Sequence, residues 1–538
     1  MIRLASFRAV AAALVIITAA FAGPPACARE KRITPYIELG QVLTADLNGG
    51  DVLTYSSVAA GVDATFQSRR AEVQISYRYE HRFSESGRLG DEDIHSGLAR
   101  AAVKLVPGLS VDGGALATRA RSDIRGAAPG LLNGNVANIS QVYSFYGGPT
   151  LGTHVGALGV SGGYRFGYTK VESPTFSSPL NVGQPRFDTF DSARNQQAQL
   201  SLNLKSGVVL PVGVTVSGGW DREDGGQLSQ VYEGRYGRGD ILLPVSPTLA
   251  LTAGAGYEHI RASQRDALLD GTGQPVVDGR GRFVVDPASS PRIAYDFDGI
   301  YYDAGVLWRP TSRTVLEARA GERYGSFSFT GSFDYQASKA VSARVGVYDG
   351  VQTFGRQLRG AISSLPTSFS TNADPLSGNF NGCVFGQQGG AAGNCLNGVF
   401  QSISTAVYRS RGVDAVLTYR RGRSTLGLGA GYASRRFFAQ QSAGFTIDGA
   451  RDESYYAQAF YGRSLDDKTA VDVNGFINYY KPGTIAARNI YSAGATASLS
   501  HSFGRVSARG SLGIFGFDAD AGLNTVSVEA LLGARYQF

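Results

Sequence analysis

The chain has 538 residues and a formal net charge of +7, and it contains 71 Gly, 27 Tyr and 28 Phe but one Met and two Trp. This composition favours β-structure with aromatic-rich surfaces over helical packing. The small excess of Lys and Arg does not resemble that of a nucleic-acid-binding protein, which concentrates its basic residues on one face.

Residues 1–28 have the pattern of a secretory signal peptide. Arg3 and Arg8 precede an apolar run over residues 9–22, and Ala26-Cys27-Ala28 forms a small-residue cleavage site. The run is shorter than the ~20 residues that a spanning helix needs, so we expect cleavage and export of residues 29–538. No later stretch is apolar for long enough to form such a helix, so any membrane insertion must use strands closed into a barrel.

A two-residue period of apolar and polar side chains recurs along the chain. Within residues 70–82, Val73, Ile75 and Tyr77 lie on one face and polar side chains on the other, an order that a helix does not produce. The same period returns at residues 164–169, 197–205, 341–348 and 471–480. Counting such segments predicts an all-β fold, a single transmembrane antiparallel up-and-down β-barrel of about 22 strands, with 20–24 as the range.

The predicted connections alternate in length. Short links occur at residues 68–69, 107–108, 244–247, 309–312, 421–422, 466–467 and 503–504. Longer polar links lie between them, at residues 83–92, 119–138, 171–193, 262–298, 350–401 and 438–452. Short turns on one rim and long loops on the other are typical of outer-membrane barrels, with the short turns facing the periplasm.

The polar face of these strands carries a mixed set of charges that we take as candidate pore-lining residues. They are Glu72, Arg78, Glu80, Arg82, Arg165, Lys205, Glu317, Arg319, Arg323, Arg344, Asp472, Arg509, Glu529 and Arg535. Opposed rows of charge select solutes in pores, whereas the alternative is a lumen in which these ions pair with one another. Arginines outnumber the acids, which predicts a mild preference for anionic or polar solutes if the lumen conducts.

The glycines of Gly427-Leu-Gly-Ala-Gly431 share the same polar face, opposite Leu426, Leu428, Ala430 and Tyr432. The segment lacks the strand-loop-helix context and the Lys-Ser/Thr ending of a phosphate-binding loop. We therefore expect these glycines to make room for a neighbouring ring or for the channel.

Segment 350–401 exceeds the usual length of a loop by far, and such insertions are usually functional or disordered. It contains Cys383 and Cys395, an even pair in an exported chain, which predicts a disulfide. Two placements stay open, either an extracellular surface loop or a constriction folded into the lumen and stiffened by that disulfide.

The sequence offers little for catalysis. Its five histidines are His81, His95, His154, His259 and His501. His95 and Ser96 are adjacent, but neighbours in a strand point to opposite faces and cannot form a base and nucleophile pair. We find no metal-ligand cluster or hydrolase motif in the sequence, so we expect no enzyme activity and no cofactor.

The last stretch, residues 525–538, alternates in the same way and ends in Tyr536-Gln537-Phe538. This ending resembles the C-terminal insertion signal of bacterial outer-membrane β-barrels, and the resemblance to that class covers residues 29–538. It implies location in the outer membrane of a Gram-negative bacterium, with the lipid of that membrane and the barrel-assembly machinery as partners, the latter through this strand.

Three functions are compatible with this resemblance. The first is a porin-like passive channel for small polar solutes. The opening Ile33-Thr-Pro-Tyr-Ile-Glu38 resembles that of uncharacterised barrels associated with exopolysaccharide export and exosortase systems. The alternative is therefore a barrel linked to polysaccharide export or envelope assembly without general porin activity. An outer-membrane hydrolase is the third. TonB-dependent receptors are disfavoured, because we recognise no plug before the first strand and no TonB box near Arg29.

Overall fold

A computed structural model gives the fold of most of the chain. It describes residues 30–50, 52–85, 92–121, 139–173, 188–279, 281–370, 376, 379–380, 382–387, 392–440, 447–483, 488–519 and 523–538. The predicted signal peptide, residues 1–28, lies outside the described residues, as do parts of the predicted loops.

The described chain is almost entirely strands, apart from the helix α2 (Phe354–Ser364) and the short 3-10 helix η1 (Gln227–Ser229). The strands are β1 (Glu30–Asp46), β2 (Val52–Gln67), β3 (Ala71–Ser84), β4 (Glu92–Val106), β5 (Leu109–Arg121), β6 (Ile139–Val155), β7 (Leu158–Glu172), β8 (Ser192–Leu204), β9 (Gly213–Gly225), β10 (Val231–Pro244), β11 (Leu249–Gln264), β12 (Arg292–Thr311), β13 (Thr314–Arg323), β14 (Ser326–Tyr335), β15 (Val341–Gln352), β16 (Cys383–Phe385), β17 (Gly393–Cys395), β18 (Val407–Arg421), β19 (Ser424–Phe438), β20 (Arg451–Ser464), β21 (Thr469–Lys481), β22 (Ile490–Phe503), β23 (Val506–Ala519) and β24 (Leu523–Gln537). Among the described residues no helix is long and apolar enough to cross a membrane.

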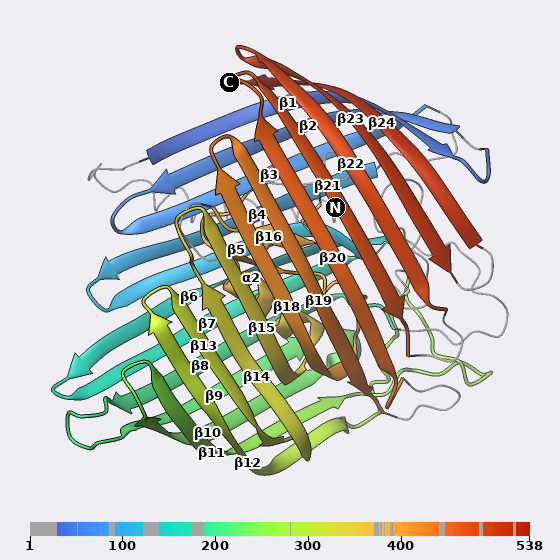
Figure 1. Ribbon diagram of the computed structural model, residues 1–538. Coiled ribbons are helices and arrows are strands. Elements are labelled where there is room, and N and C mark those ends of the chain that lie inside the picture. Colours follow the sequence, from blue (N-terminus) through green and yellow to red (C-terminus); the bar gives the residue numbers. More distant parts are fainter. Residues whose placement is uncertain are drawn as a thin grey trace.

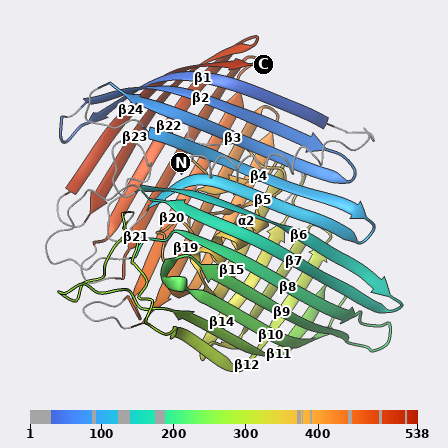
Figure 2. The same ribbon diagram turned by 180° about the vertical axis from the view of Figure 1, so that it is seen from behind.

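The long strands form one closed antiparallel ring of 22 strands (Figures 1 and 2). Each strand pairs with the next along the chain, β15 pairs with β18, and β1 pairs with β24, which closes the ring. In that closure Tyr36 of β1 lies opposite Gln537 and Leu39 opposite Ala534. Because the ring has no free edge, its backbone groups pair without water, and the predicted fold class and strand number are confirmed.

The two rims of the ring differ in the length of their connections. The links that leave β2, β4, β10, β18 and β22 have two to four residues, and the longest on that rim covers residues 205–212. The opposite rim carries the longer links, including residues 265–291 and 353–406, but also a hairpin at Tyr324 and Gly325. The predicted alternation is therefore present, with exceptions where the second rim also has short links, at residues 47–51, 226–230, 324–325 and 520–522. The predicted segment 350–401 begins later and ends later, because residues 350–352 belong to β15.

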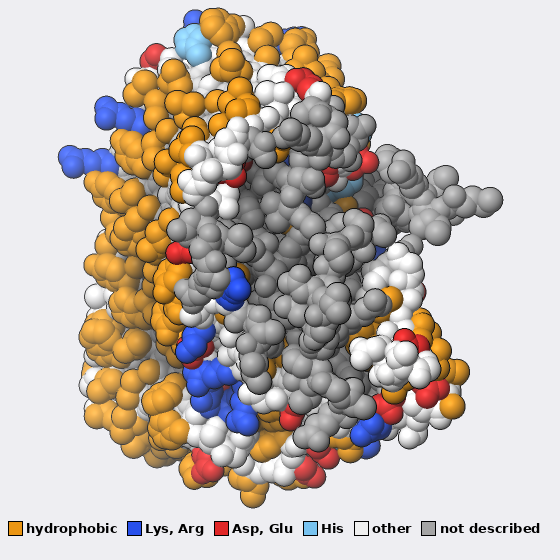
Figure 3. Space-filling model, turned by 90° about the vertical axis from the view of Figure 1, so that its right-hand side faces the viewer, with side chains coloured by type: hydrophobic (Ala, Val, Ile, Leu, Met, Phe, Trp, Pro, Cys, Tyr) orange, Lys and Arg blue, Asp and Glu red, His pale blue; other side chains and the backbone are white. Residues whose placement is uncertain are grey.

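The outer face of the ring is apolar and the inner face is polar, as the two-residue period predicts. On β24 Leu532 is 73% exposed and Leu531 only 5%, so adjacent leucines point to opposite sides of the sheet. On the same strand the side chain of Glu529 is buried and Tyr536 and Phe538 are exposed. Figure 3 shows hydrophobic side chains gathered over the outside of the strands, with charged side chains nearer the loops. This outer face suits hydrocarbon.

We call the link between β15 and β18, residues 353–406, the insert, and its described residues lie inside the ring. It contains α2 and the two-stranded sheet of β16 and β17. Both ribbon views place α2 within the ring (Figures 1 and 2). Of the two placements left open by the sequence, the described residues of the insert occupy the lumen.

Candidate functional site in the lumen

Helix α2 docks on the ring through charges that match its dipole. Near its N-terminus Asp221 of β9 accepts a 2.8 Å hydrogen bond from Arg356 and lies 3.5 Å from Arg359. Near its C-terminus Arg100 of β4 donates to the carbonyl oxygens of Ser363 and Leu365, at 3.1 and 3.2 Å. A helix carries partial positive charge at its N-terminus and negative charge at its C-terminus, so both contacts stabilise this orientation.

An apolar cluster fixes the same helix against the inner face of the ring. Phe354, Leu358 and Ile362 are fully buried, and their spacing places them on one side of α2. They pack with inward side chains of β4, β5 and β6, namely Leu98, Leu116 and Val142. Burial of each such side chain contributes about 1.5–3 kcal/mol, so the cluster stabilises the insert inside the ring.

Hydrogen bonds extend the insert across the lumen. The Gln74 side chain on β3 donates to the carbonyl of Phe369 at 2.7 Å and accepts from its N–H at 2.8 Å. On the other side, the N–H of Cys383 donates to Gln458 of β20 at 2.8 Å. Strands β3 and β20 lie far apart along the ring, so the insert spans it.

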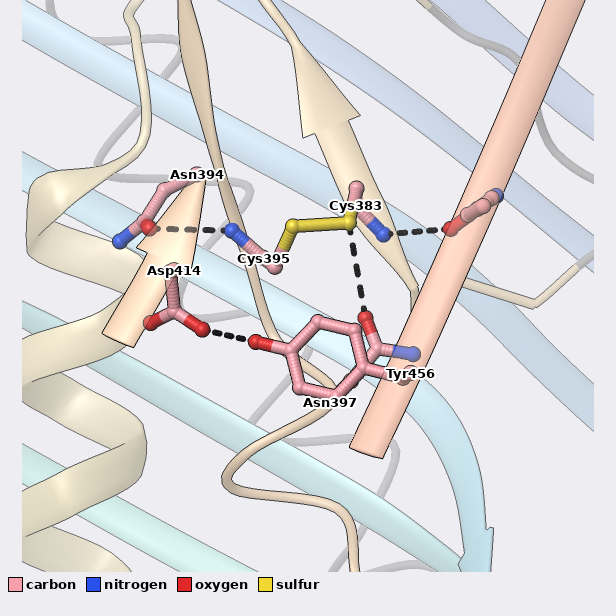
Figure 4. The surroundings of a disulfide bond; sticks show 7 residues. Cys383, Asn394, Cys395, Asn397, Asp414 and Tyr456 are labelled. Carbon is pink, nitrogen blue, oxygen red and sulfur yellow. Dashed lines mark hydrogen bonds between the residues drawn. A yellow bond between two sulfur atoms is a disulfide. The ribbon is translucent and has the colours of Figure 1, made fainter. Parts of the chain in front are cut away.

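The disulfide between Cys383 and Cys395 lies near Asp414 of β18 and Tyr456 of β20 (Figure 4), and it packs on Gly429 of β19. It joins β16 to β17 where Cys383 is directly opposite Cys395 in the small sheet. A Cβ on Gly429 would collide with Cys383 Sγ, and a Cβ on Gly427 would lie 2.8 Å from the ring of Phe385. The glycines at 427 and 429 therefore make room for the insert, the first of the two outcomes expected for them.

A buried ion pair anchors the last part of the insert. Arg435 of β19 and Asp452 of β20 are completely buried, with Arg435 Nε 3.1 Å from the Asp452 carboxylate. The same guanidinium donates to the carbonyl and hydroxyl oxygens of Ser402, at 2.8 and 2.6 Å. Tyr480 donates to Asp452 at 3.0 Å. These partners satisfy both charges where water is excluded.

A second polar region lies on β10 to β13, and we call it the charge belt: Arg238, Asp240, Asp303, Glu317 and Arg319. Arg238 donates to Asp240 on its own strand and to Asp303 two strands away, at 2.6–3.0 Å. Arg319 of β13 donates a 2.6 Å hydrogen bond to Asp240, three strands away. It also donates to Glu317 on its own strand, at 3.0 Å. The belt therefore crosses β11 and β12 along the inner face of the ring.

The side chains of the charge belt pack on glycines of β11, as the disulfide packs on a glycine of β19. A Cβ on Gly254 of β11 would collide with Arg238 and Asp240, and a Cβ on Gly256 would lie 2.7 Å from the ring of Tyr301. Tyr301 in turn faces the guanidinium groups of Arg238 and Arg323, whose Cζ atoms lie 5.5 and 4.7 Å from the ring centroid. These two glycines of β11 leave room for side chains of the neighbouring strands to meet above it.

The structure brings three of the predicted pore-lining residues into this region, Glu317, Arg319 and Arg323. Arg323 forms a two-point contact with Glu258 at 2.7 and 2.8 Å. The sequence prediction omitted Arg238, Asp240, Asp303 and Glu258. The period of two could have found Arg238 and Asp240, because Ile241 and Leu243 of the same strand are exposed on the outer face.

Most of the other predicted charges also have an ionic partner. Arg82 lies 3.2 Å from Glu80, Arg535 lies 3.1 Å from Glu38, and Arg165 lies 3.5 Å from Asp112. The remaining positions are as follows: Arg78 contacts Glu38 and Glu80, Arg344 lies 3.8 Å from Asp334, Asp472 and Arg509 lie in electrostatic range of each other, Glu529 is buried, and Glu72 is half-buried near the start of β3. Lys205 lies beyond the end of β8, because that strand stops at Leu204. Most of the predicted pore-lining charges are thus paired with an opposite charge on the inner face.

The described residues contain no group of three or more His, Cys, Asp or Glu side chains that could hold a metal ion. A closed antiparallel ring with an apolar outer face meets the requirement of hydrocarbon that every backbone polar group be paired within the protein. Gram-negative outer membranes hold barrels of this architecture and strand number. The protein is an outer-membrane β-barrel.

No family model and no curated protein matches the sequence. Among solved structures, the chain is similar to the FrpB iron transporter from Neisseria meningitidis in its apoprotein form, with 10% identity and a TM-score of 0.45 over 94% of this chain and 81% of that chain. It is also similar to the siderophore receptor PiuA from Acinetobacter baumannii, with 10% identity and a TM-score of 0.42 over 93% and 82% of the two chains.

Proposed function

We propose that this protein is a channel for small polar solutes whose aperture is set by the insert. The observation that carries the proposal is the insert itself, a folded segment fixed across a ring with a polar inner face. Its anchors on β3, β9 and β20 hold it in the lumen, so the path for a solute is the space between the insert and the ring. Such a path passes small solutes more slowly than an open ring of the same size.

The paired charges support weak selectivity between ions. An arginine that is already bonded to a carboxylate offers less attraction to a passing anion than a solitary one. We therefore keep the predicted preference for anionic or polar solutes as a mild one, with a permeability ratio of chloride to potassium of about 1–3. Reversal potentials in a salt gradient across a planar bilayer measure this ratio, and a strong cation preference would contradict it.

Single-channel recording in planar bilayers tests the proposal. The wild-type protein is compared with a variant in which residues 366–404 are replaced by a short Gly-Ser linker. This variant keeps α2 and the two flanking strands, β15 and β18. We expect small conductance steps from the wild type and steps several times larger from the variant. A matched control shortens the loop at residues 268–284, which lies outside the insert, and should leave the step unchanged.

Two results of these recordings would contradict the proposal. If neither protein conducts although both are folded, solute passage through the lumen is wrong. If both conduct equally, the insert does not set the aperture. Retention of the folded state is checked by the resistance of the barrel to unfolding in SDS without heating.

A further inference from the structure

We propose that the charge belt forms a binding subsite for a neutral, hydroxyl-rich solute of the oligosaccharide class. A recess of about 250 Å³ opens beside the belt, lined by Arg238, Asp240, Tyr301, Asp303, Arg319 and Arg323 among others. This inference rests on the proposed function, because it names the class of solute that passes the ring at this point.

The first argument is that the arginines are already paired. The three arginines of the recess are bonded to Asp240, Asp303 and Glu258, each of which lies within 2.8 Å of a guanidinium nitrogen, and Arg319 also lies 3.0 Å from Glu317. A free anion would have to displace a carboxylate from an arginine, and a free cation would have to displace an arginine from a carboxylate. A neutral solute can bind without displacing either partner, so the ion pairs of the recess stay intact.

The second argument is the geometry of the donors and acceptors. Carboxylates keep further lone pairs when they are bonded to arginine, and guanidinium groups offer up to five N–H donors in fixed directions. The side chains of Arg238, Asp240 and Asp303 remain 14%, 17% and 18% exposed, so part of each faces the recess. Vicinal hydroxyl groups both donate and accept, and a row of alternating charged donors and acceptors gives them charge-assisted hydrogen bonds.

The third argument is that the recess is a formed feature of the ring. Its lining comes from β10, β12, β13 and β14, and Gly254 and Gly256 of β11 leave room for the belt to pass between β10 and β12. Tyr301 is 3% exposed and lies between two guanidinium groups, so its ring holds Arg238 and Arg323 in position and is not a stacking surface. The donors and acceptors are thus preorganised, which lowers the cost of ordering them when a solute binds.

The experiment measures binding of maltohexaose to the full-length protein by two methods. Blocking of single-channel current is measured in planar bilayers, and heat of binding is measured by calorimetry in an alkyl dimethylamine oxide detergent, since maltoside and polyoxyethylene headgroups would compete with the probes. Polyethylene glycol of similar mass serves as the neutral probe without vicinal hydroxyls, and sodium phosphate serves as the anionic probe.

Three variants are compared with the wild type. Asp303→Asn removes one acceptor of the belt, and Thr330→Phe fills the recess from β14 without touching an ion pair. The control is Ser500→Ala, on the inner face of β22. We expect wild type and control to bind maltohexaose, and both recess variants to bind it at least tenfold more weakly, with no binding of polyethylene glycol.

The outcomes separate the subsite from the channel. Binding in calorimetry without any conductance would support the subsite and overturn the proposed function. Conductance without maltohexaose binding, or binding that both recess variants leave unchanged, would overturn the subsite and leave the channel. Binding of phosphate that Arg319→Gln abolishes, with no binding of maltohexaose, would replace the oligosaccharide with an anion.

Discussion

Two sectors of the ring use glycines in the same way and for different neighbours. On β19, Gly427 and Gly429 lie under an aromatic ring and the disulfide of the insert. On β11, Gly254 and Gly256 lie under ionic side chains that belong to the ring itself. In the first sector water is excluded and the contacts are mostly apolar, whereas in the second the charges stay partly exposed. The first therefore holds a segment in place and the second presents polar groups to the lumen.

The comparison of the two sectors shows what can lie above an inward glycine in a large barrel. At Gly254 and Gly256 of β11 and at Gly427 and Gly429 of β19, the missing Cβ marks a place where another side chain crosses the strand. It does not show whether that side chain comes from the next strand or from a distant link. The difference matters energetically, because an insert contributes buried apolar area and a belt contributes only partly screened ion pairs.

The largest expected effect comes from the ion pair under the insert. Asp452→Asn leaves Arg435 buried without its counter-charge, which costs about 3–5 kcal/mol of unfolding free energy. Thermal or urea unfolding measures the loss. The matched change in the belt is Asp303→Asn, whose partners are partly exposed, and there we expect about 1–3 kcal/mol. Equal losses at the two sites would contradict the difference drawn between the sectors.

A second prediction concerns the glycine beneath the disulfide. Gly429→Val places a side chain where Cys383 Sγ lies, so β16 and β17 must move away from β19. We expect a loss of about 1–3 kcal/mol in stability and a larger single-channel conductance, since the insert no longer rests against that side of the ring. The control is Gly475→Ala on β21, where a Cβ would meet only an ordinary contact at 3.7 Å. Unchanged conductance in Gly429→Val would show that this sector does not hold the insert in place.

A third and smaller effect is expected at the glycine beneath the belt. Gly254→Ala meets the ends of Arg238 and Asp240, which are flexible and can shift, so we expect a stability loss of about 1 kcal/mol or less. Conductance should stay the same because the insert is untouched, while binding of maltohexaose should weaken. Gly239→Ala on β10 is the control, since nothing lies within 4 Å of a Cβ there. A change in conductance would show that the two sectors are coupled.

Much of this architecture could be predicted from the sequence because a strand that crosses a membrane must alternate. The period of two identifies the outward leucines such as Leu532 and the inward charges such as Arg319, and with them the strand number. The closure of β1 on β24 follows once the fold is a barrel. The long segment between β15 and β18 could be identified by its length alone, although the sequence placed it at 350–401 and the structure places it at 353–406.

The partners of the inward residues could not be predicted in the same way. Arg319 bonds Asp240 across three strands, a contact that depends on the twist and stagger of the ring. Whether the insert enters the lumen depends on Leu98, Leu116 and Val142, inward apolar residues on strands far from it in the sequence. Lys205 was assigned to a strand because the alternation continues past Leu204, where the turn begins.

A contact outside both sectors supplies the last prediction and a reference for them. Asp188, in the link before β8, accepts a 2.9 Å hydrogen bond from the N–H of Phe283, in the link before β12. Burial raises the pKa of Asp188 to about 7, although that hydrogen bond and Arg282 oppose the rise. In an unfolded loop the pKa of an Asp is about 3.9, so the folded contact binds the proton more tightly between these values. Its stability is therefore fully present below about pH 4 and falls as the pH rises to 7.

Hydrogen exchange measures this contact locally. The protection factor of the Phe283 amide, corrected for the intrinsic dependence of exchange on pH, should fall between pH 5 and pH 8, while that of amides in β11 and β19 should not. Asp188→Asn should remove the dependence, because an amide keeps the acceptor and has no proton to lose. If protection instead rises with pH, the carboxylate is the favoured form and the two links are joined by its charge. If the amides of β11 follow Phe283, the links and the belt beneath them open together, and the belt could not serve as a site independent of the rim.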